Sequence, residues 1–409
     1  MKKVAMIGCG KLGLPCAEVM AEAYDVVGYD TQPFTSEKVK QVSLREAVEH
    51  AEIIFIAVPT PHSPEYGGDK PCLHLEPKDF NYSIVVDVLK QVNEFARPEQ
   101  LVVLISTVLP GTVRREFIQH ITVPKFLYNP YLIAMGSVSW DMVNPEMVII
   151  GTETGQSGDC ATDLVRFYMP LMQNNPRYHV GTWEEAEGIK IFYNTFISAK
   201  IGLVNMIQDV AEKVGNMCVD VVTDALSQAT HRITGPAYMR AGMGDAGACH
   251  PRDNIALRWM AQELDIGYDL FHTIMQAREV QAKNMAQKLV HLASSIATEH
   301  VWIHGKAYKP HVPYTDGSYS TLVGHYIEEM GMNVFYVDPL TGDSHESISG
   351  VVLWAHHAPT TYGNTGTELA NEQGAYCKIE EGSIILDPWR KLAADAFPGV
   401  KVVPYGNSR

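Results

Sequence analysis

The first thirty residues contain the pattern that most restricts the fold of this chain. The apolar run Val4–Ile7 leads into Gly-Cys-Gly-Lys-Leu-Gly at positions 8–13, and an apolar helical pattern continues to about Ala23. A second apolar run then ends on the acidic residue Asp30. A strand, a glycine-rich turn, a helix and an acid-terminated strand in this order predict a dinucleotide-binding βαβ unit. The alternative is a similar unit that binds another nucleotide.

Each position of this pattern has a physical role. Gly8 allows a tight turn, Gly10 lets a pyrophosphate approach the backbone, and Gly13 lets the helix pack closely on the strand. Asp30 would hold the ribose hydroxyls of adenosine, which favours NAD over NADP. We therefore expect NAD as the cofactor.

Two further strands are expected at Ile53–Val58 and Leu101–Ser106, with a helix near Asn81–Phe95 between them. Both strands run into polar loops that contain proline, at residues 58–61 and 106–111. Ligands of open α/β sheets bind beyond the carboxyl ends of the strands, so both loops are expected at the cofactor crevice. Ordinary strand-to-helix turns would use the same residue types.

A long helical pattern extends from about Glu184 to Val214. Lys190 and Asn194 are four residues apart and share one face of this helix. They form either a polar site or the edge of a solvated face. The helical composition continues to about Ser295, which indicates a middle region suited to subunit contacts.

A second alternating β/α block begins at Val301 and lacks the glycine fingerprint, so it is expected to be a Rossmann-like domain for another kind of ligand. Its expected elements are a helix at about 320–330 and strands at 334–337, 351–353 and 384–386. The predicted fold class is α/β, with two Rossmann-like doubly wound domains joined by a long central helix and a helical middle domain. The predicted domains are residues 1–180, 181–297 and 298–409.

One cysteine lies in a stretch of small residues, 244–253, that reads Gly-Asp-Ala-Gly-Ala-Cys-His-Pro-Arg-Asp. Pro251 suits the first position of a helix, so Cys249 would lie at or just before a helix N-terminus. The positive end of the helix dipole lowers the pKa of a thiol there and favours the reactive thiolate. The simpler interpretation is a small buried hydrophobic residue.

Composition and charge argue against several classes of protein. The net charge of −15 argues against nucleic acid or an anionic membrane as the main partner. The seven cysteines lack paired spacing, which indicates free thiols in a reducing cytoplasm. No stretch matches a signal peptide, a membrane span or a metal-binding motif, so we expect a cytoplasmic protein without a metal site.

Taken in order along nearly the whole chain, the motifs resemble those of the nucleotide-sugar dehydrogenases, the family of UDP-glucose 6-dehydrogenase and GDP-mannose dehydrogenase. The resemblance rests on the N-terminal fingerprint, Val58–Pro61, Ser106-Thr107, Asn129-Pro130 through Asn144-Pro145, Glu185–Lys190 with Asn194, the Cys249 loop with Asp253, and Gly305–Pro310.

The resemblance implies two successive hydride transfers from the C6 alcohol of a sugar nucleotide to two NAD⁺, with a uronate as the product. By the same resemblance, Cys249 is the nucleophile that holds the aldehyde as a thiohemiacetal and then as a thioester. Lys190 would stabilise negative charge on the C6 oxygen, and Asn194 would donate a hydrogen bond beside it. Asp253 would act as a base or orient water, and Thr107 would position water or the nicotinamide.

The resemblance also implies which residues bind ligands. Arg232 matches a family arginine that reaches the sugar of a neighbouring subunit, which with the long helix suggests at least a homodimer. The predicted substrate-binding residues are Tyr131, Lys190, Asn194, Arg232, Arg240, Gly244, Tyr308 and Lys309. The predicted cofactor-binding residues are Gly8, Cys9, Gly10, Lys11, Leu12, Gly13, Asp30, Pro59, Thr60, Ser106, Thr107, Cys249 and Arg252.

The chain departs from the family pattern at several positions. After Asn129-Pro130 the family has Glu-Phe-Leu-Arg-Glu, whereas residues 131–135 read Tyr-Leu-Ile-Ala-Met. An Arg-Glu-Ser of the family is replaced by Asp316-Gly317-Ser318, and the lysine of the cysteine loop by Arg252. We expect slow thioester hydrolysis from the first change and weaker cofactor binding from Asp316.

We expect UDP-glucose as the substrate. A UDP-N-acetyl-hexosamine or GDP-mannose substrate keeps the same chemistry. The alternative of a different class is a degenerate homologue that binds a sugar nucleotide without turnover.

Overall fold

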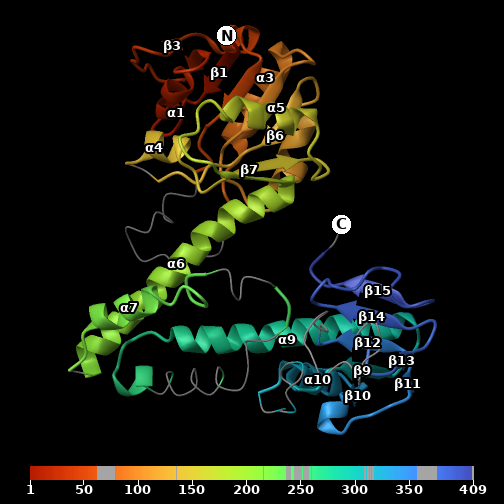
Figure 1. Ribbon diagram of the computed structural model, residues 1–409. Coiled ribbons are helices and arrows are strands. Elements are labelled where there is room, and N and C mark those ends of the chain that lie inside the picture. The colour runs from red at the N-terminus through yellow and green to blue at the C-terminus, as the bar shows by residue number, and fades with distance from the viewer. Residues whose placement is uncertain are drawn as a thin grey trace. The chain divides into compact units, whose positions relative to one another are not determined.

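The computed structural model of the chain describes residues 1–61, 79–134, 136–214, 216–235, 241–243, 251, 258, 260–307, 310, 313, 315, 317–356 and 375–407. The chain divides into two compact units, Met1–Lys200 and Ile201–Arg409, and each is described by itself (Figure 1).

The first unit is built on one eight-stranded sheet. Its strand order is β3-β2-β1-β4-β5-β6-β7-β8, and neighbouring strands are parallel except at the antiparallel pair β6–β7. The strands are β1 (Lys3–Ile7), β2 (Asp25–Tyr29), β3 (Lys40–Gln41), β4 (Ile53–Ile56), β5 (Leu101–Leu104), β6 (Lys125–Tyr128), β7 (Met147–Thr152) and β8 (Arg177–Thr182).

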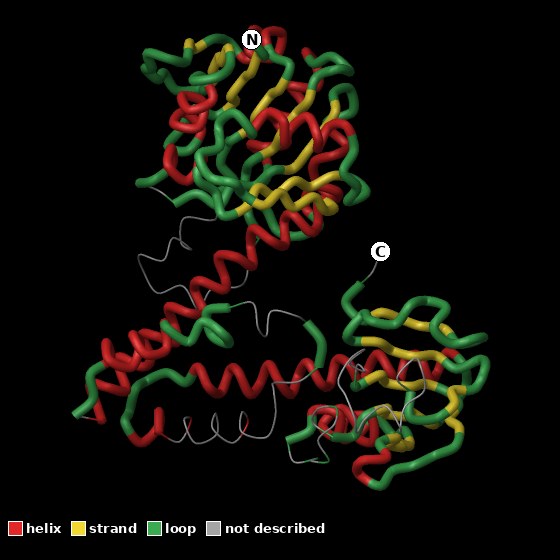
Figure 2. Tube along the Cα trace, viewed as in Figure 1, coloured by secondary structure: helices red, strands yellow, loops and turns green. Residues whose placement is uncertain are grey.

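Helices cover both faces of this sheet, because its central strands are apolar on both sides (Figure 2). On β4, Ile53 and Phe55 face one core, and Ile54 and Ile56 face the other. The first core lies under α1 (Gly13–Met20), α4 (Val138–Val143) and α5 (Asp159–Tyr168). The second lies under α2 (Leu44–His50), α3 (Ser83–Phe95), the short helical turns η2 (Val113–Phe117) and η3 (Ile118–His120), and the start of α6 (Trp183–Val214).

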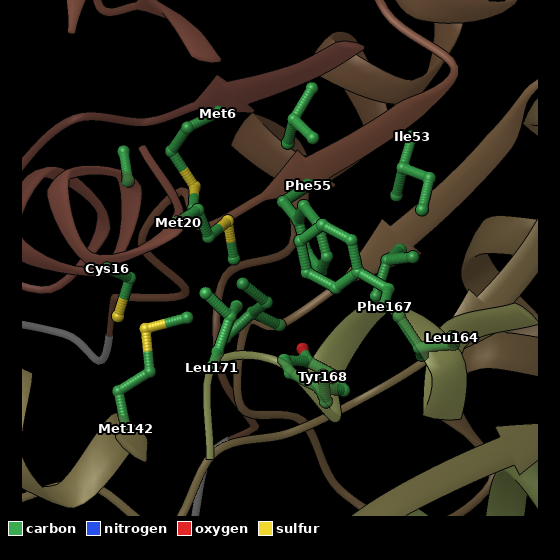
Figure 3. Packing of buried hydrophobic residues seen from close by; sticks show 14 of the residues in the cluster. Met6, Cys16, Met20, Ile53, Phe55, Met142, Leu164, Phe167, Tyr168 and Leu171 are labelled. Carbon is green, nitrogen blue, oxygen red and sulfur yellow. The ribbon is translucent and has the colours of Figure 1, made fainter. Parts of the chain in front are cut away.

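The first core is aromatic at its centre. Phe55 of β4 packs against Phe167 of α5 with ring centroids 5.2 Å apart, and Met142 of α4 points toward Cys16 of α1 (Figure 3). This packing fixes α1, and with it the glycine-rich turn, on the sheet.

The second unit contains a five-stranded parallel sheet in the order β10-β9-β12-β14-β15. Its strands are β9 (His300–His304), β10 (Asn333–Val337), β12 (Val351–Trp354), β14 (Ile384–Asp387) and β15 (Lys401–Pro404). A two-stranded sheet pairs β11 (Ser347–Ile348) with β13 (Lys378–Ile379).

Two helices, α9 (Leu270–Ser295) and α10 (Tyr319–Glu329), pack on one face of this second sheet. The other face packs around Trp354 with β11, β13 and loop residues such as Phe397, and the short helix η4 (Pro339–Thr341) follows β10. The helix α7 (Val219–Ser227) follows α6 in the chain. These features confirm the predicted α/β class with two Rossmann-like sheets and a helical segment between them in the sequence.

Across the described ranges, no helix combines the length and the apolar composition needed to cross a bilayer.

Candidate active site

The glycine-rich turn lies where the strand order of the first sheet reverses, between β1 and β4. Gly8 has a φ of 94°, and a Cβ placed on it would lie 2.7 Å from the carbonyl oxygen of Ala57. A Cβ on Gly13 would lie 1.8 Å from the carbonyl oxygen of Gly8. Both glycines therefore allow α1 and the end of β4 to approach the turn, at the point where open α/β sheets bind ligands.

Gly10 has the opposite surroundings. It is exposed, and no described atom lies within 4 Å of the position that its Cβ would take. A pyrophosphate needs such open space to reach backbone N–H groups, so this turn fits a dinucleotide cofactor. Lys11 is exposed, and Leu12 packs against the first core.

Cys9 contributes its backbone rather than its thiol to this turn. The side chain is buried, and Sγ donates to the carbonyl oxygen of Met6 at 3.5 Å. Burial, with a smaller contribution from Asp30, raises the pKa of the thiol to about 12. The thiol fits because Gly28 has no side chain, since a Cβ there would lie 2.7 Å from Sγ.

Asp30 immediately follows β2, beside the end of β1. Its Oδ1 accepts the backbone N–H of Gln32 at 2.9 Å. The carboxylate is half-buried, and its place agrees with the predicted contact to a ribose.

The loops after β4 and β5 are tied to each other. Ser106 Oγ donates to the carbonyl oxygen of Val58 at 2.6 Å, and Thr60 Oγ1 donates to the carbonyl oxygen of Thr107 at 2.7 Å. Pro59 lies between the two bonded positions and is exposed. The structure thus brings four of the predicted cofactor residues together at the carboxyl edge of the sheet.

The first turns of α6 bury one stripe against this unit. Trp183, Ala186, Glu187 and Lys190 are spaced as i, i+3, i+4 and i+7, and all four are buried. Burial lowers the pKa of Lys190, and no residue in the described ranges gives its ammonium a hydrogen bond or an ion pair. Asn194 lies one turn further along α6 with an exposed side chain.

Glu187 was not among the predicted site residues. Its two carboxylate oxygens accept the backbone N–H groups of Gly111 at 2.5 Å and Val113 at 2.7 Å, just after the Thr107 loop. Burial raises the pKa of this carboxyl to about 7, although the two N–H groups act in the opposite direction. The available sequence signal was an acidic residue on the apolar stripe of a helix.

Tyr131 belongs to a chain of hydrogen bonds in the first unit. Its hydroxyl lies 2.8 Å from that of Tyr168, which donates to Asn129 Oδ1 at 2.5 Å, and Asn129 Nδ2 donates to the carbonyl oxygen of Ile149 at 2.6 Å. Burial raises the pKa of Tyr131 well above its usual value, so the phenol stays protonated at neutral pH. Its contact with substrate stays a prediction.

An apolar hollow beside Tyr131 has room of about 20 Å³ and is lined by Pro130, Ile133, Met142 and Met172 among others. That volume suits one water molecule, whereas small-molecule sites span roughly 300–1,000 Å³. The hollow is therefore a packing feature and not a sugar site.

The remaining predicted residues fall in two groups. Arg232 follows α7 in a turn and is exposed. The others lie outside the described residues: Arg240, Gly244, Cys249, Arg252, Asp253, Tyr308, Lys309 and Asp316.

Two family models match the chain. Residues 35–171 match the NAD binding domain, and residues 184–280 the central domain, of the UDP-glucose/GDP-mannose dehydrogenase family. Together they cover more than half of the chain. The NAD binding domain agrees with the cofactor predicted from the glycine-rich turn.

Two relatives from Bacillus subtilis are UDP-glucose 6-dehydrogenases. YwqF is 24% identical over 73% of this chain and 65% of its own length, and TuaD is 24% identical over 86% of this chain and 78% of its own length. A UDP-glucose 6-dehydrogenase of Rickettsia felis is 26% identical over 64% of this chain. The chain thus spans slightly less than two thirds of YwqF and 55% of the Rickettsia protein.

One solved structure shares the fold over almost the whole length. A ternary complex of GDP-mannose dehydrogenase from Pseudomonas aeruginosa has a TM-score of 0.76 at 19% identity and covers 98% of this chain and 99% of that one. Its likeness supports the α/β fold of the chain. From these matches, the chain belongs to the UDP-glucose/GDP-mannose dehydrogenase family.

Proposed function

We propose that this protein is an NAD-dependent nucleotide-sugar 6-dehydrogenase that oxidises the C6 alcohol of UDP-glucose to a carboxylate. Membership of the family supports the reaction class, and the names of the Bacillus and Rickettsia relatives favour UDP-glucose over other sugar nucleotides. The same chemistry on GDP-mannose or a UDP-N-acetyl-hexosamine is the second candidate.

The observation that carries the proposal is the largely buried side chain of Lys190 on α6, whose burial lowers the pKa of its ammonium. A cation without a described partner is costly to bury, and structures retain such groups mainly at functional sites. An ammonium in a dry site stabilises an oxyanion far better than one in water. Lys190 would thus stabilise the alkoxide of the alcohol and the oxyanion of the later tetrahedral adducts.

The reaction proceeds through the thiol of Cys249. NAD⁺ accepts the hydride in each of the two oxidation steps. Cys249 adds as a thiolate to the C6 aldehyde and gives a thiohemiacetal, whose oxidation leaves a thioester. Water then attacks the thioester carbonyl, the thiolate departs, and the uronate is released. Asn194 and Asp253 would orient the oxyanion and the water, and Thr107 would hold water or the nicotinamide.

Hydrolysis is the step most affected by the departures from the family pattern. Tyr131 stands where the family has a glutamate, and its hydroxyl is committed to Tyr168 and stays protonated. Tyr131 is therefore a poor base, which leaves Asp253 or a bound water for this role. We expect the acylated enzyme to accumulate.

NADH absorbance against UDP-glucose, GDP-mannose and UDP-N-acetyl-hexosamines tests the proposal. The wild type should form NADH fastest with UDP-glucose, with a burst followed by a slower steady rate of two NADH per uronate. Cys249→Ala should lose sustained turnover, because the thiohemiacetal and the thioester cannot form without the thiol. No NADH with any sugar nucleotide, despite tight NAD⁺ binding, would favour the homologue without turnover.

We infer that two copies of the chain associate through α6. Phe192, Phe196 and Leu203 are 57%, 55% and 42% exposed. They fall within about 40° of one another around the helix axis. A stripe of large exposed apolar side chains on one helix is typical of an interface between copies.

A further inference from the structure

We propose that Glu187 is a positioning residue whose carboxylate ties the loop that carries Thr107 to the turn of α6 that carries Lys190. One carboxylate oxygen accepts the N–H of Gly111 and the other the N–H of Val113. These bonds join segments 74 and 76 residues apart in the sequence. Lys190 follows Glu187 by three residues on the same buried stripe.

The two N–H groups need this acceptor because Val113 is the first residue of η2 and Gly111 lies in the turn before it. The first N–H groups of a helical turn have no carbonyl partner within that turn. Tyr82 supports the same loop from α3, since its hydroxyl accepts the N–H of Leu109 and the hydroxyl of Thr112, each at 3.4 Å. The carboxylate of Glu187 is thus a charged acceptor, whereas most other hydrogen bonds of this loop join neutral groups. Charge-assisted hydrogen bonds are stronger than neutral ones.

The charges around Glu187 do not pair with it directly. No ion pair of Glu187 occurs in the described ranges, because Arg114 pairs with Glu184 and Arg115 with Glu116 and Asp79. The titratable or charged groups that act on it are Glu184 from α6, Arg114 and Arg115 from η2, and Tyr128 from β6. Lys190 lies three residues further along the same stripe of α6, and Tyr82 contacts the same loop from the start of α3.

The protonation state of Glu187 therefore changes the loop. Burial raises the pKa of its carboxyl to about 7, so it is ionised above neutral pH and protonated below it. Only the ionised form makes charge-assisted bonds to both N–H groups, because protonation turns one oxygen into a hydroxyl, which donates and is a weaker acceptor. As pH falls through about 7, one of the two bonds from Glu187 to the segment 111–113 weakens.

Ionisation of Glu187 strengthens the bonds to the loop but lowers the stability of the folded protein. The folded pKa lies above the ordinary value of 4.5, so the folded protein binds this proton more tightly than the unfolded chain. Ionisation consequently lowers stability as pH rises from about 4.5 to about 7. Replacing the carboxylate with a neutral amide removes the cost of burying a charge, but it also breaks a bond to the loop. A variant that keeps its stability but loses ligand affinity would therefore show a positioning role and not simple structural support.

The test compares Glu187→Gln with Glu185→Gln, a matched change at an exposed position of the same helix. At pH 8 the Glu187→Gln protein should melt no lower than the wild type, yet bind NAD⁺ at least tenfold more weakly by calorimetric titration. Wild-type NAD⁺ affinity should fall as pH drops from 8 to 6, and the Glu187→Gln protein should lose this dependence. Glu185→Gln should keep both the affinity and the pH profile, because its side chain is exposed and accepts the backbone N–H of Thr182.

Amide exchange gives a second measurement that needs no variant. After correction for intrinsic rates, protection of Gly111 and Val113 in the wild type should decrease from pH 8 to pH 6. Unchanged protection, or a Glu187→Gln protein with wild-type NAD⁺ affinity and pH profile, would overturn the proposal. The roles of Thr107 and Lys190 rest on the proposed function, but neither measurement involves turnover, so a wrong substrate assignment would leave these results intact.

Discussion

At the scale of single residues, two positions of the glycine-rich turn require glycine for different reasons. Gly13 has no space for a methyl group because the carbonyl oxygen of Gly8 occupies it. Gly10 has space, and its openness serves the cofactor. The fingerprint in the sequence predicted both roles, because they follow from a local strand–turn–helix geometry that a short window of residues specifies.

Alanine at these two positions should therefore have different effects. Gly13→Ala forces a backbone clash and should cost more than about 3 kcal/mol of stability. Gly10→Ala should change stability by no more than about 1 kcal/mol, while the methyl group weakens NAD⁺ binding at least tenfold. Chemical unfolding and NAD⁺ titration measure the two effects. Equal NAD⁺ affinity in Gly10→Ala and the wild type would contradict this role for Gly10.

Other important residues were not predicted because their partners are distant in sequence. Glu187 reads as one of several acids in the first turns of a helix, where the dipole favours negative charge. Only the fold shows that its carboxylate is buried against Gly111 and Val113. Similarly, nothing in the local pattern indicates that Tyr168 would bridge Tyr131 and Asn129.

At the scale of elements, the strongly periodic segments were predicted well. The helix expected from about Glu184 to Val214 is α6, Trp183–Val214, and the helix expected near Asn81–Phe95 is α3, Ser83–Phe95. The strands β6, β7 and β8 were not predicted. β8 places Arg177 and His179 on its exposed side and is only half-buried, so it lacks the continuous apolar run of an interior strand.

The contact of α6 with β7 depends on Gly151. A Cβ at Gly151 would lie 2.9 Å from the Cβ of Ala186 and 3.1 Å from the Cα of Trp183. Gly151→Ala should push the first turns of α6 from the sheet and cost about 1–3 kcal/mol of stability. Gly158→Ala is the control, because no described atom lies within 4 Å of its Cβ position.

A double-mutant cycle checks that this cost comes from the stated contact. Adding Ala186→Gly to Gly151→Ala removes the clash, so unfolding measurements should show recovery of part of the lost stability. Full recovery is not expected, because glycine within a helix costs about 1 kcal/mol relative to alanine. Additive losses in the two single variants would show that the two side chains do not interact.

At the scale of the whole chain, the sequence predicted two Rossmann-like sheets that bind different kinds of ligand. The prediction rested on a glycine fingerprint that is present in the first β/α block and absent from the second. The contact pattern divides the chain at Lys200, within α6. The predicted domain limits near residues 180 and 297 stay predictions. Sequence periodicity could not place a limit at Lys200, because this residue lies within the continuous helix α6.

Association of two copies through α6 can be tested by introducing charged residues on its exposed apolar stripe. The double change Phe196→Asp and Leu203→Asp places two carboxylates on the exposed stripe and should convert the protein to monomers in sedimentation velocity experiments. Met169→Asp is the control, because Met169 is 63% exposed and lies at the end of α5, on another helix. A wild-type protein that sediments as a monomer at micromolar concentration would remove the basis for this interface.

The buried sulfur atoms have a practical consequence for chemical labelling. Burial raises the pKa of the thiols of Cys9 and Cys16 to about 12 and of Cys377 to about 11. At neutral pH these three remain protonated and react slowly with electrophiles such as iodoacetamide. Once the more accessible Cys160 and Cys218 are replaced by serine, modification rates would report chiefly on the remaining sulfurs, Cys249 among them. If Cys72 is replaced as well, mass spectrometry could follow the modification of Cys249, the proposed nucleophile, against thiols that react slowly.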